Sequence, residues 1–119
     1  MPSVIETISQ LKEFFVRSEV KEKPLPDGRH AIRIEPVDLP SGCLPTSTAV
    51  LLIMTEGGEP NVYVKQAPDL PNGKRPQNLY PEMIDGEPWI RYSVNYPWNP
   101  GETAGRNLMG RLWRFASGD

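Results

Sequence analysis

The stretch that decides the fold is EPWIRYSVNYPWNPG, residues 87–101, which leads into the last segment of the chain. It contains Trp89 and Trp98, and the third tryptophan, Trp113, follows in that last segment. Three prolines fix the backbone of the stretch, because the pyrrolidine ring restricts φ. The pattern predicts a rigid aromatic link that leads into a C-terminal helix.

Length and composition limit the class of protein. The 119 residues are enough for one domain, 1–119, with a single core. The net charge is −2 and the lysines and arginines are scattered, so we expect no nucleic-acid partner. Fourteen prolines imply fixed turns and short elements, which argues against a helical bundle.

The rare residues exclude several kinds of site. Cys43 is the only cysteine and His30 the only histidine, which excludes an intramolecular disulfide and a multi-cysteine zinc site. We therefore expect neither a metal site nor a cofactor. Charges at Glu6 and Lys12 interrupt any signal peptide, and the apolar run Ala49–Met54 is too short to cross a membrane. These features predict a cytoplasmic protein that does not bind membranes.

Residues 3–21 are predicted to form a helix. Ser3 and Glu6 make a capping box, in which each side chain satisfies a free backbone N–H group. Pro24 ends the helical pattern. The apolar positions recur at helical spacing and form one stripe, made of Val4, Ile8, Leu11 and Phe15.

The middle of the chain predicts three strands, at residues 31–35, 49–54 and 61–65. The second is apolar on both faces, as is typical of a central, covered strand. Residues 67–87 contain four prolines and predict an irregular connection. The last helix follows residues 101–103. The fold class is therefore α+β, an antiparallel β-meander with an N-terminal and a C-terminal helix.

This order of elements resembles the ubiquitin-conjugating (UBC-like) superfamily, and more closely its compact bacterial members. The resemblance covers nearly the whole chain. It depends most on the apolar strand Ala49–Met54, on the segment Pro60–Val64 and on Asp85-Gly86 leading to Trp98-Asn99-Pro100. It implies a UBC-like fold and two partners, a ubiquitin-like protein and an activating-enzyme-like protein.

The chain departs from the family at the active-site cysteine. When Gly86 and Trp98 are aligned with the family's glycine and tryptophan, the cysteine position falls at Trp89 or Ile90. Neither side chain can form a thioester. The family's His-Pro-Asn tripeptide is also missing, and its nearest counterpart is the segment 75–78. We therefore expect no thioester at the usual position.

Two other residues are candidate catalytic nucleophiles. Cys43 would need a nearby base or cation to lower its pKa, and His30, Arg29 and Arg33 are the candidates. The alternative is a small, partly buried thiol without chemistry. Ser93 lies in the aromatic link and could carry an oxyester, although it too needs a base. Its alternative role is hydrogen bonding to the backbone.

The aromatic side chains of the link are candidates for partner binding, since aromatic residues anchor many interfaces. They are Trp89, Tyr92, Tyr96 and Trp98. The competing interpretation is that they pack in the core.

Two functions are consistent with the sequence. The first is a ubiquitin-conjugating-like protein of a bacterial ubiquitin-like modification system, acting as a scaffold or through a non-standard nucleophile. The alternative is a protein-binding module with no covalent step. Whether the chain is an enzyme therefore stays open at this point.

Overall fold

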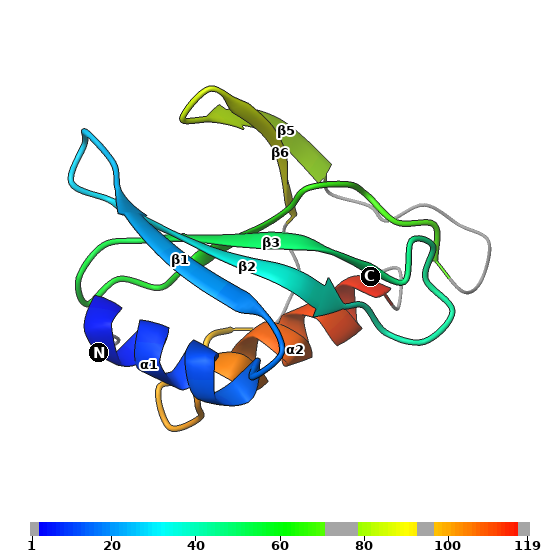
Figure 1. Ribbon diagram of the computed structural model, residues 1–119, viewed down its shortest axis with the longest axis horizontal. Coiled ribbons are helices and arrows are strands. Elements are labelled where there is room, and N and C mark those ends of the chain that lie inside the picture. The colour runs from blue at the N-terminus through cyan, green and yellow to red at the C-terminus, as the bar shows by residue number, and fades with distance from the viewer. Residues whose placement is uncertain (1–2, 71–78, 93–96, 117–119) are drawn as a thin grey trace.

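The computed structural model describes residues 3–70, 79–92 and 97–116, and within them the chain forms two helices and one antiparallel sheet of six strands (Figure 1). The strand order is β1-β2-β3-β4-β6-β5. The fold is therefore α+β, as predicted. The elements are α1 (Val4–Phe14), β1 (Glu19–Pro24), β2 (His30–Asp38), β3 (Ser47–Met54), β4 (Asn61–Val64), β5 (Leu79–Ile84), β6 (Glu87–Tyr92) and α2 (Ala104–Ala116).

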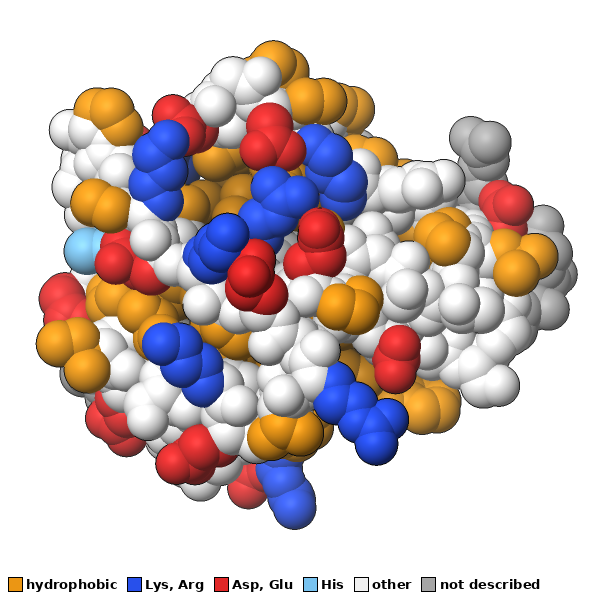
Figure 2. Space-filling model, viewed as in Figure 1, with side chains coloured by type: hydrophobic (Ala, Val, Ile, Leu, Met, Phe, Trp, Pro, Cys, Tyr) orange, Lys and Arg blue, Asp and Glu red, His pale blue; other side chains and the backbone are white. Residues whose placement is uncertain are grey.

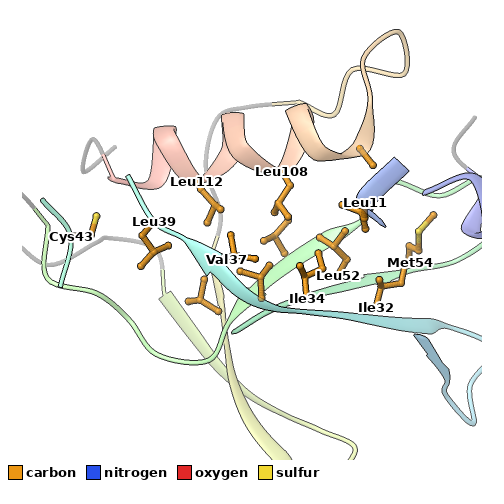
Figure 3. Close-up of a cluster of buried hydrophobic side chains, with 14 of the residues drawn as sticks. Leu11, Ile32, Ile34, Val37, Leu39, Cys43, Leu52, Met54, Leu108 and Leu112 are labelled. Carbon is orange, nitrogen blue, oxygen red and sulfur yellow. The ribbon is translucent and has the colours of Figure 1, made fainter. Parts of the chain in front are cut away.

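Strand β3 lies inside the sheet, between β2 and β4, and both of its faces are covered. Because side chains alternate along a strand, Leu52 faces one side and Leu51 the other. Both helices lie on the first side (Figures 1 and 3). There Leu108 and Leu112 of α2 pack with the sheet in what we call the helix-face cluster. The prediction that residues 49–54 form a central, covered strand is confirmed.

The opposite side of the sheet has its own apolar cluster, and the β5–β6 hairpin covers part of it (Figure 1). The hairpin contributes Ile84 and Trp89 to this groove-face cluster. The other members come from the sheet and from the turn after β1: Leu25, Ala31, Ala49, Leu51, Ile53 and Tyr63. The sheet is therefore buried on both sides, by helices on one and by its own last hairpin on the other.

The first predicted helix is too long. The backbone N–H of Glu6 donates to Ser3 Oγ at 3.0 Å, so the N-cap is confirmed, but α1 ends at Phe14. Residues 19–21, predicted as the end of that helix, instead belong to β1 (Glu19–Pro24), whose Val20 pairs with Ile34 of β2. Glutamate and lysine favour helices only weakly, and pairing with the edge of β2 outweighs that preference.

The prediction of an irregular connection over residues 67–87 is wrong in its second half. Asp85 and Gly86 have φ of 51° and 81° and form the two-residue turn of the β5–β6 hairpin. Pro81 lies on the edge strand β5, where a missing N–H group does no harm. Pro88 lies outside the short stretch of β6 that pairs with β4. The first part of the predicted aromatic link is thus a strand.

Substitution of Gly105 by alanine is expected to lower the free energy of unfolding by about 1–2 kcal/mol. A Cβ atom on Gly105 would lie 2.5 Å from Phe14 Cβ and 2.7 Å from its Cδ2, and would also overlap Cγ. The two helices would have to move apart, which costs more than the gain in helix propensity. Urea unfolding measures the change. The matched control is Arg106→Ala, at an exposed position next to it, and an equal loss in both variants would contradict the close contact.

Candidate functional site

A groove of about 380 Å³ opens on the side of the sheet away from the helices, between β1 and the β5–β6 hairpin. Figure 2 shows hydrophobic side chains at the bottom of this hollow and charged side chains around it. Its size is near the lower end of the range for small-molecule sites. The buried floor is made of Leu25, Ala31, Leu51, Ile84 and Trp89, and the rim includes Lys21, Lys23, Arg33, Asp85 and Glu87.

Trp89 is one of the two positions, with Ile90, to which the resemblance assigns the family's nucleophile. The side chain is only 3% exposed. The guanidinium carbon of Arg33 lies 5.4 Å from the indole centroid and Lys65 Nζ lies 5.0 Å from it. Both distances are within the range of cation–π attraction. This position therefore carries a buried aromatic side chain beneath two cations and has no group that can attack a carbonyl.

Glu87 holds these two cations in place. Its carboxylate accepts a hydrogen bond from Lys65 Nζ at 2.8 Å and one from Arg33 Nη1 at 3.2 Å. The hydrogen bond from Lys65, and then the charges of Lys65 and Arg33, hold the pKa of Glu87 below its ordinary value of 4.5. The group is therefore ionised at neutral pH, but its lowered pKa and its two ion pairs make it a weak general base.

Cys43 lies in the core at the other side of the sheet. Its side chain is 1% exposed and belongs to the helix-face cluster, at one end of the row of side chains in Figure 3. Burial raises the pKa of the thiol. A thiol in this environment stays protonated and behaves as a small apolar side chain.

The candidate activating groups lie far from Cys43. His30 begins β2 and Cys43 follows its end, so the length of the strand, roughly 26 Å, separates them. His30 Nδ1 lies 3.1 Å from Glu22 Oε2, and Arg29 pairs with Asp27. Arg33 lies on the groove rim. The structure thus brings none of the three to the thiol.

The two tryptophans among the candidate partner-binding residues belong to different apolar clusters. Trp89 belongs to the groove-face cluster, whereas Trp98 packs against the helix-face cluster. The backbone N–H of Trp98 donates to Glu59 Oε1 at 3.0 Å, and the guanidinium carbon of Arg111 lies 5.3 Å from its ring. Both tryptophans therefore have packing roles.

The remaining site predictions fall at the edge of the described part of the chain or beyond it. Tyr92 ends β6, where it pairs with Leu79. Ser93 and Tyr96 lie outside the described residues. Their proposed roles, an oxyester at Ser93 and partner contact at Tyr96, stay predictions.

Asn107 is an important residue that the sequence analysis missed. It is 1% exposed, on the buried side of α2. Its Oδ1 accepts from the backbone N–H of Asn99 at 2.8 Å, and its Nδ2 donates to the carbonyl oxygens of Asn99 and Thr103 at 2.9 and 3.1 Å. The side chain of Asn107 therefore holds the Trp-Asn-Pro link against the start of α2. An asparagine in the apolar stripe of a predicted helix was the available signal.

Tyr63 is expected to ionise at an unusually high pH. Burial, and then the hydrogen bond that its hydroxyl donates to Glu82 at 2.9 Å, raise the pKa of Tyr63 to about 12. The folded chain holds this proton more tightly than the unfolded chain does. Its contribution to stability is therefore complete below pH 10, the ordinary pKa, and is lost as the pH rises toward about 12.

Absorbance titration of the tyrosines tests this expectation. Tyr63→Phe should remove the step near pH 12. Tyr80→Phe replaces an exposed tyrosine of β5 and should leave that step in place. A late step that survives Tyr63→Phe would show that another tyrosine carries it.

The described residues contain neither a metal-binding cluster nor a membrane-spanning helix. Within residues 3–70, 79–92 and 97–116, no group of three or more His, Cys, Asp or Glu side chains is placed to hold a metal ion. The same residues contain no helix with the length and hydrophobicity needed to span a membrane.

Comparison of the chain with family models, with curated proteins and with solved structures found no match.

Proposed function

We propose that this chain is a UBC-like protein-binding module with no covalent step, which holds a ubiquitin-like protein and an activating-enzyme-like protein of a bacterial modification system. The order of elements supports the UBC-like assignment: a helix, a meander of antiparallel strands, a Trp98-Asn99-Pro100 link and a second helix. The assignment of partners rests on that resemblance.

The observation that carries the non-covalent role is the state of Trp89. A transfer enzyme needs an exposed nucleophile with a base or a lowered pKa. Of the two aligned positions, Ile90 has an aliphatic side chain and Trp89 is a buried indole under Arg33 and Lys65. The thiol of Cys43 is buried and its pKa is raised. These two findings favour binding over catalysis.

Intact mass spectrometry tests the covalent step. The chain is incubated with ATP and with the activating-enzyme-like and ubiquitin-like proteins encoded in the same genome. We expect no mass increase on this chain. An adduct would overturn the proposal, and its loss in Ser93→Ala or in Cys43→Ala would identify the nucleophile.

A gain-of-function control tests the alignment itself. Ile90→Cys places a thiol at the aligned position that is partly exposed, whereas position 89 lies in the core. If the chain is UBC-like, Ile90→Cys is expected to gain an adduct that a reducing thiol removes. Failure of this variant, with folding verified by circular dichroism, would contradict the alignment.

The binding step needs a separate measurement. Chemical-shift changes in the ¹⁵N-labelled chain, recorded during titration with the same ubiquitin-like protein, report non-covalent association. We expect saturable changes without an adduct. If neither protein binds, the chain is a binding module for another partner and the UBC-like partners are wrong.

A further inference from the structure

The β5–β6 hairpin is joined to the rest of the sheet over a very short stretch. Its two strands pair with each other from Leu79↔Tyr92 to Ile84↔Glu87. The pairing of β6 with β4 is limited to Tyr63↔Arg91 and Val64↔Ile90. Most of the hairpin therefore extends beyond the sheet, over the side that carries the groove (Figure 1).

The tip of the hairpin reaches the opposite edge of the sheet. Lys23 Nζ, on the first strand of the sheet order, donates to the carboxylate of Asp85 in the hairpin turn. Next to it, Ile84 is buried with Leu25 in the groove-face cluster. The hairpin thus spans the groove from its base on β4 to its contact with β1.

The two tip contacts differ in strength. The Lys23 and Asp85 side chains are 65% and 43% exposed, and water screens ion pairs at such positions, so this pair contributes little. Burial of the Ile84 side chain contributes more. The pairs of Glu87 with Arg33 and Lys65 are also partly exposed and contribute little, and Trp89 is buried next to the junction with β4. The contacts beyond Trp89 are therefore small beside the two apolar clusters that hold the sheet and the helices. Opening at the tip therefore costs less than global unfolding.

We propose that the β5–β6 hairpin is a strap that swings away from β1 and opens the groove while β1–β4 and the two helices stay folded. Its junction with β4 is the hinge, where the adjoining Trp89 stays buried. Beyond the hinge, Ile84 is the main apolar contact that keeps the strap closed, and the pairs of Glu87 with Arg33 and Lys65 also break on opening. The floor beneath it includes Ala31 and Leu51, which are 8% and 4% exposed in the closed state and become fully accessible only in the open state. This conformational property does not depend on the proposed function.

Thiol labelling separates strap opening from global unfolding. Ala31→Cys places a thiol on the groove floor, and the native Cys43, buried in the other cluster, reports global unfolding in the same molecule. The chain is labelled with N-ethylmaleimide under native conditions, and peptide mass spectrometry gives the rate at each site. The introduced thiol is expected to react at least about tenfold faster than Cys43, because local opening is more frequent than unfolding.

Two further variants identify the contact that keeps the strap closed. Adding Ile84→Ala to Ala31→Cys should speed labelling of the introduced thiol by about tenfold, the factor that corresponds to the loss of most of a buried side chain. Adding Lys23→Gln should change it by about twofold or less. Neither change should raise the rate at Cys43 to the same degree.

Clear outcomes would overturn the proposal. Equal rates at the two thiols would mean that the groove opens only on unfolding. A rate at the introduced thiol equal to that in the urea-unfolded chain would mean that the hairpin covers nothing. If Ala31→Cys does not fold, Leu51→Cys on the same floor replaces it with the same expectations.

Discussion

Replacement of Trp89 by alanine is expected to lower the free energy of unfolding by about 3–5 kcal/mol, the usual cost of deleting a buried aromatic side chain. The indole is 3% exposed and packs in the groove-face cluster. Its removal leaves a cavity, and it takes away the ring over which Arg33 and Lys65 lie. Urea unfolding followed by circular dichroism measures the change.

The matched control is Trp113→Ala. The side chain of Trp113 is 62% exposed on α2, so its loss should change the free energy of unfolding by about 0.5 kcal/mol or less. Similar effects of the two substitutions would show that Trp89 is not a core residue. A small effect of Trp89→Ala alone would reopen this position as a surface for partners.

Substitution of Asn107 by alanine is expected to cost about 1–3 kcal/mol, because it leaves the part-buried backbone N–H of Asn99 without its partner. It also removes the side-chain donor to the carbonyl oxygens of Asn99 and Thr103, which keep their backbone donors. The loss of these side-chain hydrogen bonds frees the start of α2 from the Trp-Asn-Pro link. Thermal and urea unfolding of the variant measure the loss.

Asn99→Ala provides the control with the same chemistry. The Oδ1 of Asn99 accepts a hydrogen bond from the backbone N–H of Gly101 at 2.9 Å, at an exposed position. Because water replaces that bond, this substitution should cost about 1 kcal/mol or less. Equal losses in the two variants would contradict the special role of Asn107.

The parts of the fold that were predictable are those whose local pattern agrees with their burial. The run 49–54 is apolar on both faces and is covered on both faces. The N-cap at Ser3 depends on neighbouring residues only. By contrast, β1 has a sequence that suits a helix, and only its distant partner β2 makes it a strand. The hairpin was missed because prolines usually exclude strands, whereas here they lie where no ladder bond is needed.

The groove was less predictable than the fold. Arg33, Lys65 and Glu87 are separated by more than twenty residues at each step, and only the register of β2, β4 and β6 brings them to one place. In the sequence they were scattered surface charges. The family resemblance singled out Trp89 together with Ile90. The burial of Trp89, however, follows only from the path of the hairpin over the sheet. Long-range pairing therefore decided the site.

The composition of β1 has a consequence for how this protein behaves at high concentration. Strand β1 is the first in the sheet order, and its outer side is a row of backbone groups on which another chain could add a strand. Its sequence, EVKEKP, puts four charges and a proline on that edge. An incoming strand would have to desolvate those charges. The residues that mimic a helix in the sequence thus protect the sheet from edge-to-edge aggregation.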